Sequence, residues 1–176
     1  AAPLPCPGGK RKDSTLTRSM TSEADCITCS VGTFCPVGSE NETLCAPGTV
    51  NPLEGRESCV NCVAGKYQDG AGNTTCKDCT PGYYCAEGSA APLPCPGGTT
   101  KRLGVTMVSA ADCDVCGEGT FCPVGSAEAT PCAAGTYNDR PKRETCTPCG
   151  EGSYQNETGA TGCKPCPDGY YCAAGS

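Results

Sequence analysis

The cysteines of this chain recur at a fixed interval, and that interval constrains the fold more than any other feature. The segment Ala1–Gly9 is repeated without change at Ala90–Gly98, and the chain ends on the Gly-Ser dipeptide that also precedes the second copy. From Cys26 onward, adding 87 to the number of a cysteine gives the number of another cysteine. A fixed period of this kind is typical of repeat arrays. We therefore predict two units, 1–89 and 90–176, both belonging to a longer array.

Composition argues against a conventional hydrophobic core. The 176 residues include 20 cysteines, 24 Gly and 16 Pro, but no Trp and only two Phe. Ordering the backbone costs about 1–2 kcal/mol per residue, and so few large apolar side chains cannot offset that cost. Disulfides, each worth about 2–3 kcal/mol for a short loop, must supply the difference. The predicted fold is small and disulfide-rich: an extended rod of tandem cysteine-rich modules with short β-ribbons, almost no helix and no central hydrophobic core.

The density of cysteines also indicates the compartment. Disulfides form and persist in oxidising environments, so we expect an extracellular protein, either secreted or held at the cell surface. No segment approaches the roughly 20 apolar residues that span a bilayer. Because the sequence shows neither an initiator Met nor a signal peptide, we expect an internal or mature portion of a longer chain.

Glycine follows many of the cysteines at a fixed distance. The pattern Cys-x-x-Gly-x-aromatic occurs, for example, at Cys62–Tyr67, and seven of the nine aromatic residues lie two positions after such a glycine. Glycine at a fixed offset predicts a turn with positive φ. The aromatic residue is expected in a short extended segment beyond the turn, where it covers the adjacent disulfide. These aromatic residues are Phe34, Tyr67, Tyr84, Phe121, Tyr137, Tyr154 and Tyr171.

The same glycine predicts how the cysteines pair. If each cysteine with Gly at +3 opens a loop and the next cysteine closes it, all twenty pair without remainder. The predicted disulfides are Cys6–Cys26, Cys29–Cys35, Cys45–Cys59, Cys62–Cys76, Cys79–Cys85, Cys95–Cys113, Cys116–Cys122, Cys132–Cys146, Cys149–Cys163 and Cys166–Cys172. Because Cys35, Cys85, Cys122 and Cys172 also have Gly at +3, an interleaved alternative stays open, with Cys26–Cys35 and Cys29–Cys45. Connectivity does not follow from sequence alone.

Serial loops predict an elongated arrangement, because each loop contacts only its neighbours along the chain. The two long loops at Asp13–Asp25 and Lys101–Asp112 are predicted to be joints between modules. Hydrophobic periodicity adds little, since the sequence contains no helical stripe at i, i+3 and i+4.

The cysteine motifs resemble those of a known family. The runs Cys-x-x-Cys-x-x-Gly-x-Tyr/Phe and Cys-x-Pro/Ala-Gly-Thr are similar to the cysteine-rich ephrin-receptor-like modules, which are related in style to tumour-necrosis-factor-receptor modules. Such modules occur in ephrin receptor ectodomains and in large surface proteins of protists and algae, including flagellar-hair (mastigoneme) proteins. The resemblance covers the whole chain. It implies an extracellular scaffold, and no ligand-contact motif carries over to particular residues.

Zinc binding is the main alternative to disulfides. The segments Cys59–Cys62 and Cys76–Cys79 have the spacing of a four-thiolate zinc site. However, the chain has no His, and zinc would leave Cys45 and Cys85 needing other partners. Calcium is disfavoured because no Asp-x-Asp-x-Asp loop is present. We therefore predict no metal site and no cofactor.

Catalysis is not expected either. Hydrolytic chemistry lacks a His general base, and no paired carboxylates stand in a recognisable setting. Redox catalysis through Cys-x-x-Cys would need a pair bonded to itself within a βαβ pattern, and neither is indicated. We predict a non-enzyme without catalytic residues.

Glycosylation is the one modification with a positive signal. Asn41, Asn73 and Asn156 each begin an Asn-x-Ser/Thr sequence with no Pro between, which is the acceptor pattern for N-linked sugar. Asn51 is followed by Pro and does not qualify. The Ser/Thr-rich loops are weaker candidates for O-linked sugars.

Charge bears on the choice of partner. The formal net charge of −6 argues against nucleic acid. The basic clusters Lys10–Lys12, Lys101–Arg102 and Lys142–Arg143 lie in loops that also carry acidic residues. A solvated loop surface is therefore favoured over a heparin-like contact.

The predicted function is structural. The two units start and end at the same point of the repeat and share their cysteine spacing. This pattern favours an extracellular stalk or filament that is crosslinked by disulfides, such as a flagellar hair or a surface coat. The expected partners are further copies of the chain or other extracellular matrix and surface proteins. The alternatives are the ligand-binding ectodomain of a cell-surface receptor or adhesin, and a protist variable surface antigen.

Overall fold

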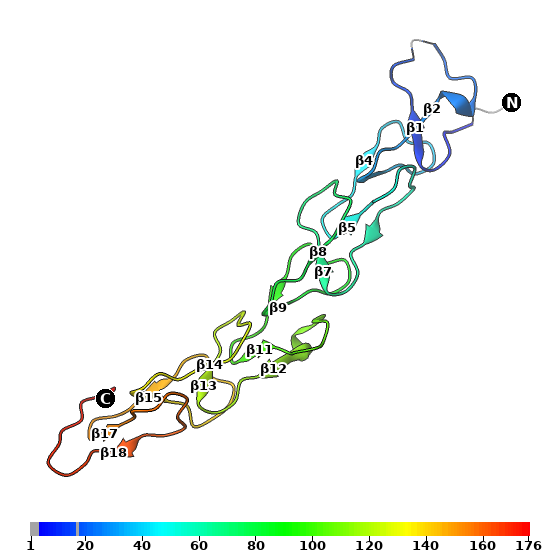
Figure 1. Cartoon of the computed structure of the whole chain (residues 1–176). Coiled ribbons are helices and arrows are strands. Elements are labelled where there is room, and N and C mark those ends of the chain that lie inside the picture. The colour runs from blue at the N-terminus through cyan, green and yellow to red at the C-terminus, as the bar shows by residue number, and fades with distance from the viewer. Residues whose placement is uncertain (1–3, 17) are drawn as a thin grey trace. The chain divides into compact units, whose positions relative to one another are not determined.

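The fold is a series of two-stranded antiparallel ribbons joined by turns (Figure 1). The computed structural model describes residues 4–16 and 18–176. Within those residues the helical structure amounts to two 3-10 helices of three residues each. The predicted class is confirmed: the protein is small and disulfide-rich, with almost no helix and with short ribbons in tandem. No helix in the described part of the chain is long and apolar enough to cross a bilayer.

The chain divides into two units. The first comprises Ala1–Asp78 with Cys85–Pro92, and the second comprises Cys79–Tyr84 with Leu93–Ser176. The strands of the first unit are β1 (Lys10–Lys12), β2 (Cys26–Thr28), β3 (Thr33–Phe34), β4 (Thr43–Leu44), β5 (Thr49–Val50), β6 (Val60–Asn61), β7 (Lys66–Tyr67) and β8 (Lys77–Asp78). Those of the second are β9 (Tyr83–Tyr84), β10 (Leu93–Pro94), β11 (Thr99–Lys101), β12 (Cys113–Val115), β13 (Thr120–Phe121), β14 (Thr130–Pro131), β15 (Thr136–Tyr137), β16 (Thr147–Pro148), β17 (Ser153–Tyr154) and β18 (Lys164–Pro165). Each odd-numbered strand pairs with the next strand along the chain. The repeat boundary between residues 89 and 90 stays a prediction.

A turn with glycine at its third position precedes most of the odd-numbered strands. In the turn Ala46–Thr49, the Thr49 amide donates to the Ala46 carbonyl oxygen at 3.0 Å, and Gly48 has a φ of 86°. Positive φ at the third residue is the signature of a type II turn, which glycine adopts without steric cost. The predicted positive-φ turns are thus confirmed.

A side-chain hydroxyl gives many of these turns a second hydrogen bond. Thr49 Oγ1 donates to the Ala46 carbonyl oxygen at 2.7 Å. The preference for Ser or Thr after the turn glycine follows from this bond, which fixes the side chain against its own turn. The same bond closes the turns that end at Thr33, Ser39, Ser89, Thr99, Thr120, Ser126, Thr136 and Ser153.

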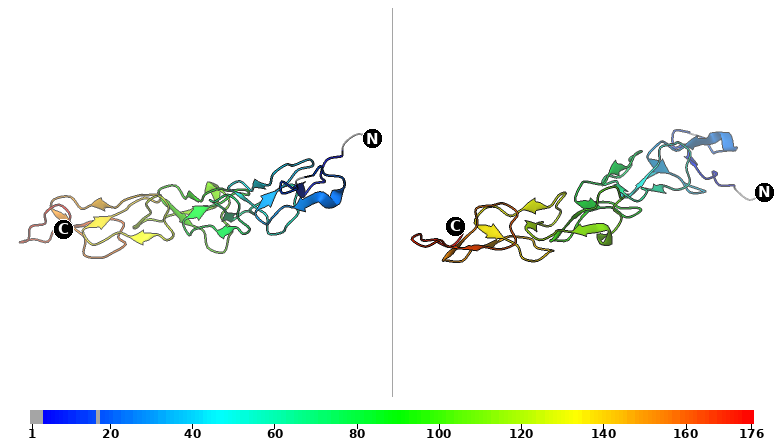
Figure 2. Two further views of the ribbon diagram at one scale, coloured as in Figure 1. Left: turned by 90° about the horizontal axis from the view of Figure 1, so that it is seen from above. Right: turned by 60° about the horizontal axis from the view of Figure 1, so that its bottom comes forward.

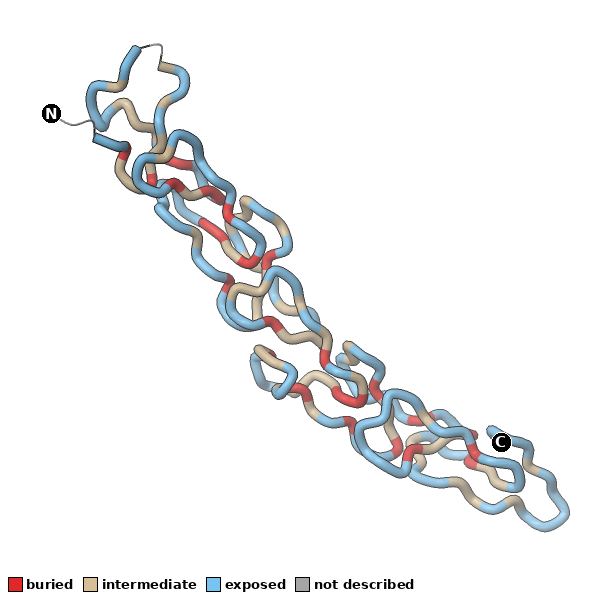
Figure 3. The backbone as a smooth tube through the Cα atoms, turned by 180° about the vertical axis from the view of Figure 1, so that it is seen from behind, coloured by how far each residue is buried: buried red, intermediate tan, exposed pale blue. Residues whose placement is uncertain are grey.

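Sulfur atoms take the place of a hydrophobic core. Among the described residues, the buried apolar side chains are cysteines apart from Val50 and Met107. Figure 3 shows the buried residues as short separate stretches. Larger apolar side chains such as Leu44 and Val60 remain exposed. The units are therefore held by crosslinks and backbone hydrogen bonds, as the predicted fold without a central core requires.

The two long loops are hairpin tips, so the prediction that Asp13–Asp25 and Lys101–Asp112 join modules is wrong. The first loop lies between β1 and β2, which pair over three residues with Lys12 opposite Cys26. β11 and β12 enclose the second loop in the same way. Because both ends of each loop leave the same ribbon, the loop projects from a module and does not connect two of them.

Each long loop ends in a 3-10 helix whose last residue caps it. These helices are η1 (Glu23–Asp25) and η2 (Ala110–Asp112), drawn as coiled ribbons in Figure 2. Asp112 Oδ2 accepts hydrogen bonds from the amides of Val108 and Ser109 at 3.0 and 2.9 Å. Bonds of this kind stabilise the ionised carboxylate. They hold the pKa of Asp112 below its usual value, with the Val108 amide as the main cause.

Asp25 fixes the first loop in the same manner. Its carboxylate accepts from the amides of Thr21 and Ser22 at 2.7 and 3.0 Å and pairs with the Arg18 guanidinium at 2.5 Å. The bond from Arg18 is the largest of the causes that lower the pKa of Asp25. In both units, one acid therefore anchors the returning end of the loop.

Candidate functional site: the disulfide ladder and the module joints

Disulfides close consecutive loops along both units. The structure contains the pairs Cys6–Cys26, Cys29–Cys35, Cys45–Cys59, Cys62–Cys76, Cys95–Cys113, Cys116–Cys122, Cys132–Cys146, Cys149–Cys163 and Cys166–Cys172. Cys79 and Cys85 are disulfide-bonded as well. No cysteine in the described part of the chain is free. The interleaved alternative would need Cys26–Cys35 and Cys29–Cys45, and those cysteines have other partners in the structure.

Apart from the Cys6–Cys26 and Cys95–Cys113 modules, which carry the two long loops, the modules are of two kinds, which differ in the residue six positions after the opening cysteine. In the first kind this residue is the closing cysteine, as in Cys29–Cys35 and Cys116–Cys122. In the second kind the closing cysteine comes fourteen positions after the opening one. An amide side chain then stands where the short loops have sulfur. These amides are Asn51, Gln68, Asn138 and Gln155.

Asn51 bridges two segments from inside its module. Its side chain has 0% exposure, and Nδ2 donates to the carbonyl oxygens of Thr33 at 2.8 Å and Ser58 at 3.1 Å. Thr33 lies in the preceding module, and Ser58 directly precedes the closing Cys59. A buried carbonyl group without a donor costs about 1–3 kcal/mol. One side chain therefore satisfies two groups and links two modules.

Asn138 keeps this arrangement, whereas the two glutamines donate only within their own loops. Asn138, 1% exposed, donates to the carbonyl oxygens of Thr120 and Thr145 at 2.9 and 3.2 Å. Gln68 donates from Nε2 to the carbonyl oxygen of Thr75 at 2.6 Å, and Thr75 directly precedes the closing cysteine of its module. The amide thus fastens the long loop at the point that the short loops close with sulfur.

Glycine backbones join each module to the next one and also to the module after that, so the prediction that each loop contacts only its neighbours along the chain is wrong. The amide of Gly48 donates to the carbonyl oxygen of Gln68 at 2.7 Å, and the carbonyl oxygen of Gly48 accepts from Cys62 at 2.8 Å. A Cβ on Gly48 would overlap the carbonyl group of Gly88, so this close approach requires glycine. The same contact joins Gly9 to Gly55, Gly32 to Gly72, Gly82 to Gly125, Gly98 to Lys142, Gly119 to Gly159 and Gly135 to Gly175. Backbone contacts therefore replace side-chain packing at the joints.

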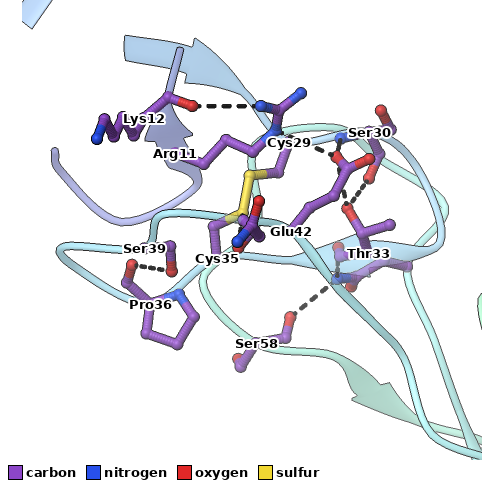
Figure 4. The surroundings of a disulfide bond; sticks show 12 residues. Arg11, Lys12, Cys29, Ser30, Thr33, Cys35, Pro36, Ser39, Glu42 and Ser58 are labelled. Atoms are coloured by element: carbon purple, nitrogen blue, oxygen red, sulfur yellow. Dashed lines mark hydrogen bonds and ion pairs between the residues drawn. A yellow bond between two sulfur atoms is a disulfide. The ribbon is translucent and has the colours of Figure 1, made fainter. Parts of the chain in front are cut away.

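A half-buried ion pair lies beside the Cys29–Cys35 disulfide (Figure 4). Glu42 Oε2 accepts from the Ser30 amide at 3.0 Å and lies 3.9 Å from Arg11 Nε. The Ser30 bond lowers the pKa of Glu42 because it favours the ionised form. Since Arg11 belongs to β1 and Glu42 precedes β4, the pair links the first ribbon to the second.

Of the three glycosylation candidates, Asn41 lies between two disulfide-closed loops, whereas Asn73 and Asn156 lie within the loops closed by Cys62–Cys76 and Cys149–Cys163. Asn41 is exposed in a bend before β4, and Asn156 is exposed shortly after β17. Asn73 is half-buried, and its Nδ2 donates to the carbonyl oxygen of Ala71 at 3.4 Å. Sugar at these positions stays a prediction, for which Asn41 and Asn156 are the better placed.

The cysteines with zinc spacing are engaged elsewhere. Cys59 and Cys76 belong to the disulfides Cys45–Cys59 and Cys62–Cys76, and Cys79 is disulfide-bonded too. Over residues 4–16 and 18–176, no group of three or more His, Cys, Asp and Glu side chains is arranged to hold a metal ion.

The basic clusters are partly neutralised by nearby acids. Lys10 Nζ lies 2.8 Å from a Glu23 carboxylate oxygen, and Arg102 Nε lies 2.7 Å from one of Asp114. Exposed pairs of this kind contribute little to stability. They do reduce the positive charge available to an anionic partner, as expected of a solvated loop surface.

Part of the second unit matches a known family. The family model described as tyrosine-protein kinase ephrin type A/B receptor-like matches residues 135–174. This segment holds the joint glycine Gly135, the buried amides Asn138 and Gln155, and the disulfide Cys149–Cys163. Residues 135–174 form an ephrin-receptor-like module. No curated protein matches the chain.

The same joint glycine, buried amides and disulfide recur 87 positions earlier, over residues 48–87. There Gly48 makes the joint, Asn51 and Gln68 are the buried amides, and Cys62–Cys76 is the matching disulfide. The ephrin-receptor-like module and the many disulfides together point to an extracellular protein.

The burial of these four amide side chains could not be predicted from the sequence. Their only signal is positional, since Asn or Gln falls six residues after a cysteine, where other modules have a second cysteine. The sequence draws attention to Asn51 only as a failed glycosylation acceptor, and the structure instead places it inside the module.

Proposed function

We propose that this chain is part of an extracellular structural stalk or filament built from tandem cysteine-rich modules. The observation that carries the proposal is the repeated joint, in which a turn glycine of one module meets a loop glycine further along the chain, as Gly48 meets Gly88. A joint made of backbone atoms tolerates amino-acid substitutions at the positions around it. Modules can therefore be added in series without redesign of each contact.

The disulfides suit such a role mechanically. Each closes a loop of at most about twenty residues, so a cut or a local opening stays confined to one module. Short loops closed by disulfides contribute about 2–3 kcal/mol each. Stability is then distributed along the chain, which is what a stalk exposed to proteases and tension requires.

The proposal includes no catalysis. The chain has no His to serve as a general base. N-linked sugar at Asn41, Asn73 and Asn156 would keep the surface soluble, and the expected partners are further copies of the chain or other extracellular proteins. A flagellar hair or a surface coat is the proposed setting.

The test measures length against the number of units. One, two and three copies of the 176-residue chain, fused in tandem and fully oxidised, should show a maximum dimension in small-angle X-ray scattering that grows by an equal increment per copy. Reduction should expose the chain to proteases and replace the equal increment by the slower growth of an unfolded chain, whose size rises as about the 0.6 power of its length. A dimension that grows only as the cube root of mass would mean collapse into a globule, and the proposed role would be wrong.

A ligand-binding ectodomain is the second candidate. It is favoured by a groove of about 410 Å³ lined by Tyr154, Pro167, Tyr170 and Tyr171. Aromatic side chains in an exposed groove are frequent at binding sites. Specific capture of a soluble ligand, lost on mutation of these tyrosines, would favour this candidate over the stalk.

A further inference from the structure

One loop of the second unit carries basic side chains in an order that the rest of the chain lacks. Arg140, Lys142 and Arg143 lie in the loop between β15 and β16, inside the Cys132–Cys146 disulfide. Counted back from the peptide bond between Arg143 and Glu144, basic residues occupy the first, second and fourth positions. No other peptide bond of the sequence has basic residues at these three positions. The pattern is therefore a property of this one loop.

The basic side chains of this loop are open to solvent. Residues 139–145 are all exposed, with the Arg140 side chain 75% and the Arg143 side chain 46% exposed. A carboxylate oxygen of Asp139 lies 3.9 Å from Arg140 Nε, and the other lies 4.0 Å from a guanidinium nitrogen of Arg143. Exposed ion pairs at such distances are weak. Both guanidinium groups are therefore available to another molecule.

The other basic clusters of the chain are held in ribbons. Lys10–Lys12 forms β1, and Lys101 ends β11 one residue before Arg102. β1 pairs with β2, and β11 pairs with β12. An endoprotease takes its substrate as an extended segment that hydrogen-bonds like an added strand, and a strand already paired in a ribbon is not free to do so. Arg140–Arg143 belongs to no strand, so it is the basic segment best placed to be drawn out.

Two backbone hydrogen bonds hold the middle of this loop closed. The Lys142 amide donates to the Cys116 carbonyl oxygen at 2.8 Å, and the Arg143 carbonyl oxygen accepts from the Cys122 amide at 2.8 Å. Lys142 also has a φ of 63°, a left-handed conformation that disfavours a residue with a Cβ. Drawing the segment out into an extended strand breaks the two bonds but releases this strain. Opening is therefore easier here than at Gly55, the counterpart of Lys142 in the first unit, which has no Cβ.

We propose that the bond between Arg143 and Glu144 is a processing site, cut by a subtilisin-like proprotein convertase of the secretory pathway. Acidic pockets of the protease would bind the side chains of Arg143, Lys142 and Arg140, since proteases select substrates by pockets of complementary charge. The cut is a hydrolysis, in which one water molecule adds across the amide bond. It leaves a carboxylate on Arg143 and an amino group on Glu144. An extracellular protein rich in disulfides passes through this pathway.

The Cys132–Cys146 disulfide decides what the cut does to the chain. It spans the bond between residues 143 and 144, whereas every other cysteine after residue 143 pairs with a cysteine that also follows it. The two parts therefore stay joined through sulfur and separate only when that disulfide is reduced. Processing leaves the array at its full length but makes its continuity at this point depend on one crosslink.

The experiment treats the full oxidised chain with a purified subtilisin-like proprotein convertase. We expect one cut after Arg143, seen as the mass gain of one water before reduction and as fragments 1–143 and 144–176 after it. Arg140→Gln should slow this cut by about tenfold or more, because the pocket for the fourth position loses its charged partner. Trypsin needs a basic residue only at the cut itself, so it should cut the parent and Arg140→Gln equally fast after Arg143.

A second variant tests whether the pattern is sufficient. Leu53→Arg with Gly55→Lys gives the first unit the same three basic positions before the bond that follows Arg56, and a second convertase cut should appear there. Arg56→Gln is the matched control, since Arg56 is exposed, and it should leave the cut after Arg143 unchanged. A thiol titration that finds no free cysteine shows that each variant has formed its disulfides.

An oxidised chain that the convertase leaves intact overturns the proposal, and cleavage of the reduced chain would then show that the fold hides the site. Cleavage chiefly at the basic residues of β1 or β11 overturns it as well. So does equal cleavage of the parent and Arg140→Gln by the convertase. None of these results bears on the proposed stalk, which rests on the glycine joints and is tested by length.

Discussion

Lys142 holds the backbone conformation that Gly55 holds 87 residues earlier. The φ of Lys142 is 63° and that of Gly55 is 68°. The amide of Lys142 donates to the Cys116 carbonyl oxygen at 2.8 Å, as that of Gly55 does to Cys29 at 2.9 Å. A residue with a Cβ in this left-handed region costs about 1–2 kcal/mol. The second unit therefore keeps its joint at the cost of local strain.

Replacing Lys142 by glycine should relieve this strain. Lys142→Gly is expected to raise the free energy of unfolding by about 0.5–1 kcal/mol, because the relieved strain exceeds the added entropy of the unfolded chain. Guanidinium unfolding of the oxidised protein, followed by tyrosine fluorescence, measures the change. The reciprocal Gly55→Lys should lower the free energy of unfolding by a similar amount. A Lys142→Gly variant no more stable than the parent would show that the left-handed conformation of Lys142 carries no appreciable strain.

The buried amide of Asn51 should matter more than an exposed one. Asn51→Ala leaves the carbonyl groups of Thr33 and Ser58 without their donor, and we expect a loss of about 2 kcal/mol or more. Asn61 is the matched control, since it is exposed and its side chain bonds to the Glu87 side chain at 3.2 Å. Asn61→Ala should change stability by less than about 0.5 kcal/mol. Equal effects of the two substitutions would contradict the bridging role.

Turns and ribbons were predictable because their causes are local. A glycine three residues after a cysteine predicts a positive-φ turn such as the one at Gly48, and the short ribbon β5–β6 begins directly after that turn. The role of Asn51 could not be predicted, because a single amide in a cysteine-rich chain does not stand out. Its importance becomes visible only when the Cys45 module is compared with the Cys29 module, where Cys35 occupies the equivalent position. Its burial depends on Thr33 in another module, and that is tertiary information.

Two other features also could not be predicted, because they too depend on contacts with distant segments of the chain. Tyr84 and Tyr171 share one motif, yet Tyr84 packs against Met107 while Tyr171 is 94% exposed. The motif sets the backbone, and a separate segment decides whether the ring is covered. Likewise, the pairing of β1 with β2 across a long intervening loop depends on register, which no local pattern in Asp13–Asp25 reveals.

The cap at Asp112 makes the stability of its loop depend on pH. The folded-state pKa of Asp112 is lowered from 3.8, so the ionised carboxylate stabilises the fold above about pH 3.8. That contribution is lost as the pH falls through the folded-state pKa. Asp112→Asn should therefore lower the melting temperature at pH 7 and have a smaller effect at pH 2. Asp168→Asn, an exposed position in a turn, is the control and should have little effect at either pH.

The glycosylation sites should differ in occupancy. Asn41 and Asn156 are exposed, whereas Asn73 is half-buried and bonds to its own turn. In a secretory eukaryotic host we expect sugar chiefly on Asn41 and Asn156, detected as a loss of intact mass after treatment with a glycosidase. Asn41→Gln and Asn156→Gln should each remove one glycan. A mass that the glycosidase leaves unchanged would refute the prediction.

A module of the second kind should be convertible into the first kind. Asn51 follows Cys45 by six positions, as Cys35 follows Cys29, and both lie just beyond a turn with a positive-φ glycine. In the double variant Asn51→Cys with Cys59→Ser, we expect a disulfide between Cys45 and the thiol introduced at position 51, which replaces both the amide bridge and the original crosslink. Peptide mapping without reduction identifies the new pair.

The single variant Cys59→Ser is the control, because it leaves Cys45 without a partner and should release one thiol per chain on denaturation. The double variant should release none and should resist proteolysis better than the single one, since a closed loop of about six residues still restricts the unfolded chain. Two free thiols in the double variant would mean that position 51 is not the structural equivalent of position 35. The amide would then be a local adaptation of the long loop, and the two kinds of module would not share one backbone plan.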